Sequence, residues 1–135
     1  MADETTRVDA WLYTTLTASV PLTGGWHSEQ APRGTASPFG VFAMISARDV
    51  QTHSADRMMV DALYTVRVIS ETESFVDLQD AADAIDTALH QSDGTAGGAS
   101  VMSTTREEII RRVEIDDGRE HRSLGAYFRV LVQLP

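Results

Sequence analysis

Hydrophobic positions recur with helical spacing in two segments of the chain. The first segment predicts a helix over about Arg7–Ala18, whose apolar stripe consists of Val8, Trp11, Leu12 and Leu16. The second predicts a helix over about Ser74–Gln91, whose apolar side consists of Leu78, Ala81, Ala82, Ile85 and Leu89. On its opposite side stand four aspartates spaced by three, Asp77, Asp80, Asp83 and Asp86. We expect these aspartates to form a solvated acidic face.

Alternation of side chains, rich in β-branched residues, predicts strands elsewhere in the chain. The predicted strands are Trp26–Glu29, Phe39–Ala47, Met58–Ser70, Val101–Asp116 and Ser123–Leu134. Polar or glycine-rich sequences predict a loop at Arg48–Asp56 and a turn at Gly94–Ser100. Long strands joined by short turns predict an α+β fold, with a mainly antiparallel β-sheet of four to five strands and two α-helices packed on one face.

The second face of this sheet has no helix left to cover it. We expect that face to be partly apolar, with side chains such as Tyr64, Val66, Val68, Tyr127 and Leu131. A sheet with a half-apolar face and exposed edges seldom stays alone in solution. The pattern therefore predicts that the protein assembles with copies of itself or with a partner.

Composition narrows the class of protein. The chain has 135 residues, which predicts a single domain (1–135), and it has no cysteine, which excludes thiol chemistry and disulfides. All eleven cationic side chains are arginine, and the net charge is −9. No basic stripe for gripping duplex nucleic acid is visible. No apolar run approaches the roughly 20 residues of a membrane helix, and the acidic N-terminal sequence lacks a signal core, so we expect a cytoplasmic protein without membrane contact.

The sequence offers no converging set of catalytic groups. His27, His53, His90 and His121 are scattered, and there is neither a nucleophile elbow nor a phosphate-binding loop. The spaced aspartates of the second helix are better explained by solvation than by a divalent cation. We therefore expect no catalytic residues, no cofactor and no metal.

Several signatures occur in an order that resembles a known family. They are the helix VDAWLYTTLTAS, the Pro-led strand SPFGVFAMIS at Ser37–Ser46, the strand YTVRVIS at Tyr64–Ser70, the helix AADAIDTALH at Ala81–His90 and the closing strand LGAYFRVLV at Leu124–Val132. Over nearly its whole length the chain resembles the small tail terminator (tail completion) proteins of long-tailed double-stranded DNA viruses. It departs from them at Ala99–Arg106, which is longer and more polar than expected there.

The resemblance implies a non-enzymatic protein of the virion, located in the tail at the head–tail joint and in the host cytoplasm before assembly. It implies a homo-oligomeric ring, commonly a hexamer, that caps the head-proximal end of the tail tube and ends its polymerisation. Its partners would be the tail tube protein and a neck or head-completion protein, and DNA would pass through the ring without specific binding. An acidic subunit suits such a bore because it repels phosphates. Adaptation to solubility or to salt explains the acidity equally well.

Other interpretations stay open at this point. The protein could be another neck component, such as a head–tail connector or stopper, or a tail tube subunit, which would form long cylinders in isolation. From a different class, a small-ligand-binding or enzymatic α+β domain would show a pocket with converging polar groups.

Candidate contact residues come from the polar excursions of the predicted core and from the arginines near the C-terminus. The excursions are Trp26–Arg33, Arg48–Asp56 and Gly94–Ser103, because functional contacts concentrate in loops on a rigid sheet. The adjacent methionines fit an adaptable contact patch and core filling equally well. Interleaved arginines and acids favour ion pairs between subunits. The candidate interaction residues are Trp26, Arg33, Arg48, Gln51, His53, Arg57, Met58, Met59, Arg111 and Arg129.

Overall fold

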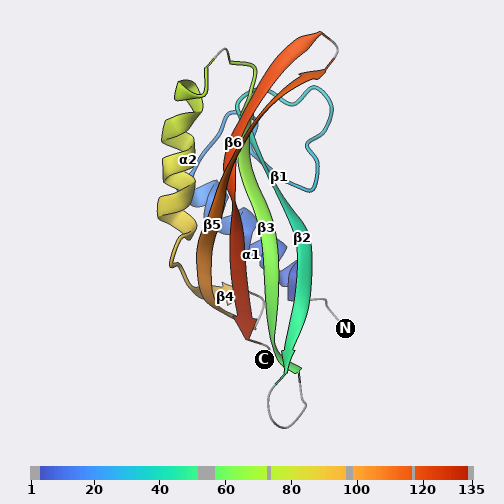
Figure 1. The fold of residues 1–135 in the computed structure, drawn as a ribbon, viewed down its shortest axis with the longest axis vertical. Coiled ribbons are helices and arrows are strands. Elements are labelled where there is room, and N and C mark those ends of the chain that lie inside the picture. The colour runs from blue at the N-terminus through green and yellow to red at the C-terminus, as the bar shows by residue number, and fades with distance from the viewer. Residues whose placement is uncertain (1–3, 52–56, 73, 97–98, 117, 134–135) are drawn as a thin grey trace.

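Two helices and six strands make up the described part of the chain in a computed structural model (Figure 1). The structure describes residues 4–51, 57–72, 74–96, 99–116 and 118–133. The elements in chain order are α1 (Glu4–Ser19), β1 (Trp26–Ser28), β2 (Phe39–Gln51), β3 (Arg57–Ser70), α2 (Val76–Leu89), β4 (Gly94–Ala96), β5 (Ala99–Asp116) and β6 (Arg119–Gln133).

Both helices form where their apolar spacing predicts them. The stripe of α1 is buried at Val8, Leu12 and Leu16, and the apolar side of α2 is buried at Leu78, Ile85 and Leu89. On the outer side of α2, three of the four spaced aspartates, Asp77, Asp80 and Asp83, are exposed. The predicted acidic face of this helix is therefore confirmed for these three, whereas Asp86 is half-buried and lies 3.5 Å from Arg106 Nε of β5.

The sheet has more strands than expected, and it is mixed. Its order is β1-β2-β3-β6-β5-β4, and β1 pairs with β2 in parallel while the other pairs are antiparallel. The prediction of four to five strands missed β4, which lies in the segment predicted as a turn and pairs with the start of β5. A three-residue strand of Gly, Thr and Ala is too short to show alternation.

The second strand is also longer than expected. β2 continues through the first part of the predicted loop Arg48–Asp56, as far as Gln51, and residues 52–56 of that loop lie outside the described residues. β1 covers β2 only at Gly40–Phe42, so the rest of β2 is an edge of the sheet. Polar and charged residues are common on edge strands, which is why this end of β2 looks like a loop in the sequence.

The central strands β3 and β6 show which side of the sheet meets the helices. Tyr64, Val66 and Val68 are fully buried in the core, and the Tyr64 hydroxyl donates to Asp9 Oδ1 of α1 at 2.8 Å. The expectation that these three residues share the second face with Tyr127 and Leu131 is therefore wrong. The register puts Tyr64 opposite Phe128 and Thr65 opposite Tyr127. Alternation divides a strand into two sets, but it does not say which set faces the helices.

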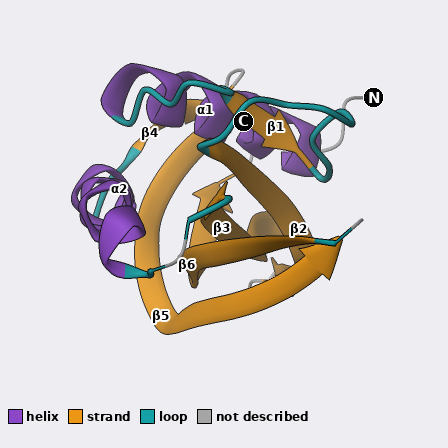
Figure 2. Ribbon diagram, turned by 90° about the horizontal axis from the view of Figure 1, so that it is seen from above, coloured by secondary structure: helices purple, strands orange, loops and turns teal. Residues whose placement is uncertain are grey.

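We call the side of β3 and β6 that points away from the helices the open face. It carries the alternate set of side chains, namely Leu63, Thr65, Arg67, Tyr127, Arg129 and Leu131, all of which are half-buried. The sheet is not flat: α1 contacts both β1 and β4, near its two edges, so the strands bend around this helix (Figure 2). Bending and twist of this kind bring neighbouring backbones close together.

Gly125 of β6 marks the closest such approach in the centre of the sheet. A Cβ atom at Gly125 would lie 2.0 Å from the Val66 carbonyl oxygen and 2.5 Å from the Arg67 Cα of β3. Because backbone atoms cannot move aside as a flexible side chain can, only glycine fits this position without shifting a strand.

We expect Gly125→Ala to lower the free energy of unfolding by about 1–3 kcal/mol, the usual cost of overpacking. Urea unfolding followed by circular dichroism measures the change. The control is Thr105→Ala on the exposed part of β5, which should stay within about 0.5 kcal/mol of the original protein. A Gly125→Ala variant as stable as this control would contradict the close approach.

Candidate assembly surface

Four charged side chains cross the open face, one from each of four neighbouring strands. Arg129 of β6 donates from Nη1 to Asp61 Oδ1 of β3 at 2.7 Å, and from Nε and Nη2 to the two carboxylate oxygens of Glu107 of β5 at 3.0 Å each. Arg48 of β2 reaches Asp61 Oδ2 at 3.4 Å. We call this row, Arg48–Asp61–Arg129–Glu107, the charge ladder.

The charge ladder is tightest at its centre. The Asp61 side chain is only 11% exposed and binds an arginine on each side. The hydrogen bonds from Arg129 to Glu107 raise the pKa of Arg129 most, and the hydrogen bond to Asp61 raises it further. This arginine therefore stays charged. A bidentate arginine–carboxylate pair also has a strict geometry. The charge ladder therefore ties four strands together on the side that no helix covers.

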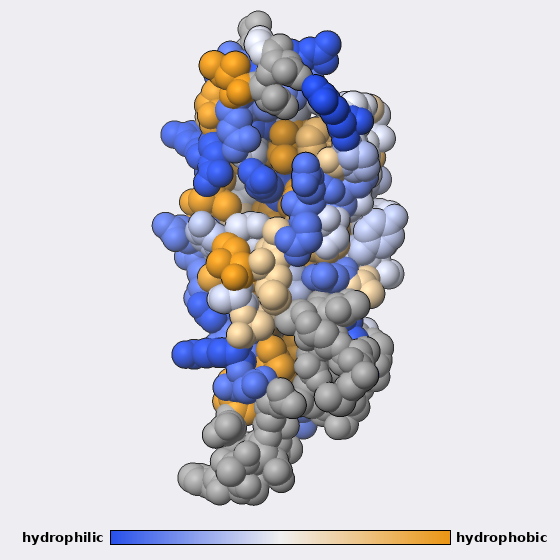
Figure 3. Space-filling view, turned by 90° about the vertical axis from the view of Figure 1, so that its right-hand side faces the viewer, coloured by the Kyte–Doolittle hydropathy of each residue, from blue (hydrophilic) through white to orange (hydrophobic). Residues whose placement is uncertain are grey.

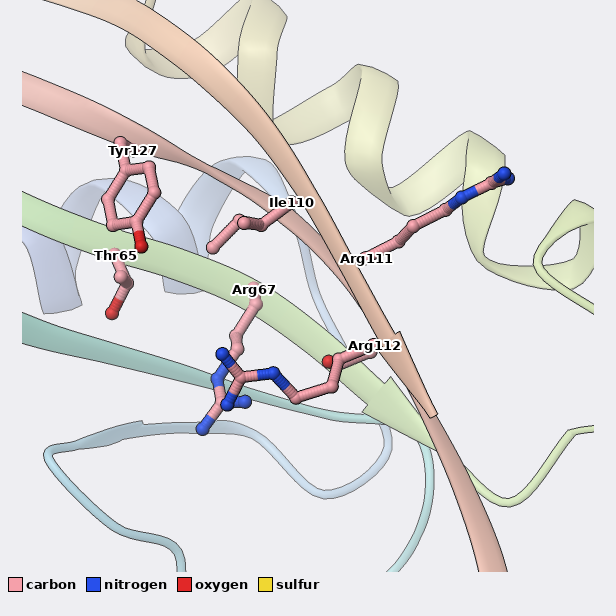
Figure 4. A pocket seen from close by; sticks show the side chains of 7 residues that line it. Thr65, Arg67, Ile110, Arg111, Arg112 and Tyr127 are labelled. Atoms are coloured by element: carbon pink, nitrogen blue, oxygen red, sulfur yellow. The ribbon is translucent and has the colours of Figure 1, made fainter. Parts of the chain in front are cut away.

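A second arginine cluster lies further along the open face, where β5 passes over β3. Arg67 Nη1 lies 3.9 Å from Glu114 Oε1, and Arg112 Nη1 lies 3.5 Å from the same oxygen. Next to them is a cavity of about 210 Å³, which we call the arginine pocket (Figure 4). It is lined by Thr65, Arg67, Ile110, Arg111, Arg112, Ser123 and Tyr127.

The arginine pocket does not have the chemistry of an active site. Among the described residues that line it there is no carboxylate and no imidazole, so it offers no ordinary general base. In the same described part of the chain, no three His, Cys, Asp or Glu side chains are close enough to hold a metal ion. What the pocket offers is positive charge and hydroxyl groups, which can bind an anionic group.

Exposed apolar side chains gather on the outer part of β5. We call residues 109–116 and 118–122 the distal hairpin; it projects beyond α2 in Figure 1. Ile109, Val113 and Ile115 are all exposed, and Ile115 reaches 77%. On the side of the molecule shown in Figure 3, hydrophobic residues instead form patches separated by hydrophilic ones. The second face, which the sequence predicted to be partly apolar, is thus crossed by ion pairs. The most exposed apolar side chains of β5 lie instead on the distal hairpin.

The structure brings two of the ten candidate contact residues together and places others apart. Arg48 and Arg129 meet at Asp61. Trp26 is only 4% exposed, and its Nε1 donates to the Val20 carbonyl at 2.8 Å, so it is a core residue of the subunit. Arg111 points away from the arginine pocket, and its guanidinium lies 5.1 Å from the centre of the Phe75 ring.

The other candidates lie near the β2–β3 connection or in the segment before β2. Arg33 is exposed and Met59 is half-buried. Gln51 and Arg57 pair at the end of β2 and β3, and Met58 follows in β3, but the side chains of these three are outside the described part. His53 lies outside the described residues altogether. No comparison tests whether these residues contact a partner, so that role stays a prediction.

Sequence reasoning missed the acidic members of the charge ladder, Asp61 and Glu107. A signal for Asp61 was present, because a lone carboxylate interrupts the apolar strand sequence MMVDALYTVRV. A buried carboxylate of this kind needs a cationic partner. Glu107 lay in a run of alternating charges, and it sits at a register shift of β5 that alternation alone cannot locate.

The sequence matches the family described as Tail completion protein gp17 over residues 10–133, nearly the whole chain. The protein belongs to this family. The resemblance noted from its signatures is thereby confirmed, and membership gives it a structural role in the tail of a virion. A family of structural proteins also supports a role without catalysis.

Solved structures share the fold at low sequence identity. One, described as "Virion of native gene transfer agent (GTA) particle", has a TM-score of 0.55 and 17% identity, and the match covers 97% of this chain and 90% of that one. A second, whose description states no function, has a TM-score of 0.60 and 16% identity, with 98% and 94% covered. No curated protein matches the sequence significantly. Within the described residues, no helix is long and apolar enough to cross a membrane.

We expect the centre of the charge ladder to contribute more to stability than its Arg48 end. Asp61→Ala should lower the free energy of unfolding by about 1–3 kcal/mol, because it leaves a partly buried Arg129 without its closest partner. Arg48→Ala should cost less than about 0.5 kcal/mol, because the Arg48 side chain is 79% exposed. Unfolding in urea measures both changes. Equal losses of unfolding free energy in the two variants would show that Asp61 is not the central group.

Proposed function

We propose that the protein forms a closed ring that caps the head-proximal end of the tail tube, ends tube polymerisation and joins the tail to the neck. The observation that carries this proposal is the family match over residues 10–133. Termination needs no chemistry; it requires a subunit that fits the last tube ring on one side and offers a different surface on the other.

The exposed apolar side chains support assembly. Ile109, Val113 and Ile115 lie on one side of β5 and are 59%, 46% and 77% exposed in the described part of the subunit. Contiguous exposed apolar surface usually marks a contact with another protein. If copies pack head to tail, the same contact repeats around the assembly and closes into a ring when the rotation closes.

The shape of the subunit suits a cap with two unlike ends. In Figure 1 the distal hairpin lies at one end of the long axis, and the end of β2 with the start of β3 lies at the other. A ring with its subunits in one orientation would therefore present two different surfaces. The net charge of −9 suits a bore for DNA, because an acidic wall repels phosphates.

The proposal predicts a single closed species and a specific effect on tube growth. Sedimentation and negative-stain images should show rings of one mass, reached above a threshold concentration. Added to the tube protein of the same virus, these rings should shorten the tubes and appear at one end only. Long cylinders of this protein alone would identify a tube subunit instead, and a monomer at all concentrations would contradict ring formation.

Ile115→Asp tests the apolar contact. Because Ile115 is 77% exposed, the variant should unfold within about 0.5 kcal/mol of the original protein. It should nevertheless need an at least roughly tenfold higher concentration to form rings, since a carboxylate would be buried at the contact. Thr14→Asp on the exposed side of α1 is a control for added charge. Unchanged assembly of Ile115→Asp would remove the distal hairpin from the contact.

A further inference from the structure

Two arginines of similar exposure on the open face differ in how well they are paired. Arg129 makes three hydrogen bonds to carboxylates at 2.7–3.0 Å. The Arg67 side chain is less exposed, at 29%, yet within the described part of the chain its ion pair with Glu114 is at 3.9 Å. A guanidinium has five N–H donors, and a half-buried one is stabilised by a carboxylate in close contact. Arg67 therefore has donor capacity that the described residues of the subunit do not use.

The neighbouring arginine adds to this excess of positive charge. Arg112 shares the same Glu114 oxygen at 3.5 Å, so two guanidinium groups have one carboxylate between them. Figure 4 shows both side chains extending to the same place, while Arg111 extends to the other side of β5. Tyr127 and Thr65 place hydroxyl groups on the adjacent wall of the cavity. This arrangement is suited to binding one further carboxylate.

The complementary charge lies on the opposite side of the same subunit. Asp77, Asp80 and Asp83 are exposed on α2, and the helix itself contains no arginine or lysine. Asp83 accepts a hydrogen bond from Gln79 at 2.8 Å, whereas Asp80 has no ion pair among the described residues. Like charges three residues apart on a helix repel each other. A cation from outside the subunit would relieve that repulsion.

We propose that the arginine pocket of one subunit receives an aspartate carboxylate, centred on Asp80, from α2 of a second copy. The inference rests on the ring proposed above and names one contact within it. Because α2 packs on the core side of the sheet and the pocket lies on the open face, the contact is head to tail and repeats from copy to copy. Arg67 and Arg112 supply the donors, and Ile110 with Tyr127 forms the wall beside them.

A nucleic-acid phosphate fits the same site less well. The chain carries a net charge of −9, and Glu114, which is 55% exposed, stands between the two guanidinium groups. A duplex would meet this repulsion along its whole length, whereas a single aspartate meets only the pocket. Binding of DNA at the pocket would therefore contradict the proposal.

The chain has no cysteine, so an engineered cysteine pair gives a clean test. The double variant Asp80→Cys with Arg112→Cys should form disulfides between copies under mild oxidation. Non-reducing gels should show a series of bands ending at the ring size, because each subunit would link to two neighbours. Either cysteine alone should give nothing larger than a dimer. Asp80→Cys with Ser100→Cys, an exposed site at the far end of β5, is the matched control and should give no such series.

A charge exchange tests the electrostatics without covalent bonds. Arg112→Glu and Asp80→Arg should each raise the concentration needed for rings by about tenfold or more at low salt, and the double variant should recover most of the loss. Arg67→Gln, which keeps a polar side chain in the half-buried position, should weaken assembly in the same direction. Circular dichroism checks that every variant is folded.

The outcomes separate this inference from the proposed function. Rings that form without the cross-link series and ignore the charge exchange would overturn the pocket contact and leave ring formation intact. Absence of rings in the unaltered protein would overturn the proposed function itself. Fluorescence anisotropy with a labelled DNA duplex gives the third arm: binding lost in Arg112→Glu, with rings unchanged, would assign the pocket to phosphate and overturn the proposal.

Discussion

The structure depends on the two helices covering only one side of its central strands. The two helices bury one side of β3 and β6, where Tyr64, Val66 and Phe128 have essentially no exposed surface. Two helices cannot also cover the other side, so the open face must be stable in contact with water. It achieves this with half-buried side chains and the charge ladder, which links β2, β3, β6 and β5 through Arg48, Asp61, Arg129 and Glu107. Directional ion pairs stabilise a half-exposed surface without making it adhesive to other proteins.

The open face is consequently not uniform. Its charge ladder is internally paired, because Arg129 makes three close hydrogen bonds to Asp61 and Glu107. The arginine pocket is not, because Arg67 and Arg112 share Glu114 at longer distances. The same residue type thus serves two purposes at two places on one surface. Where carboxylates of the subunit surround an arginine it holds the fold together, and where they do not it is available to another molecule.

The sequence predicted the parts of the fold in which hydrophobic periodicity is long and unbroken. Both helices and the strand around Tyr64–Ser70 follow from it. The side of the sheet that faces the helices did not follow, because Leu63 and Ile69 make the set on the open face partly apolar, although that set also contains Thr65 and Arg67. β4 and the outer part of β2 are edge segments of three or four polar or small residues, too short to show a period.

For the candidate site, Arg48 and Arg129 were named, but their joint partner Asp61 required the strand register. Trp26 was predicted as a contact residue but lies in the core. A tryptophan next to polar residues has the same local sequence whether its side chain faces a partner or the core.

Charge placement also bears on the symmetry of assembly. In a subunit with net charge −9, an isologous dimer that packed α2 against α2 would set Asp80 and its neighbours against identical aspartates. Packing the open faces together would place both arginine pockets in one contact and leave the acidic helices out of it. Only a contact between unlike sides puts the acidic helix on the arginine pocket, and unlike sides produce a ring or a filament rather than a dimer. A protein that ends a tube must close its own assembly, so the angle set at this contact decides between the two. The opposite charges on the two sides of the sheet therefore favour head-to-tail assembly. The angle between neighbouring copies at this contact must then close the assembly into a ring.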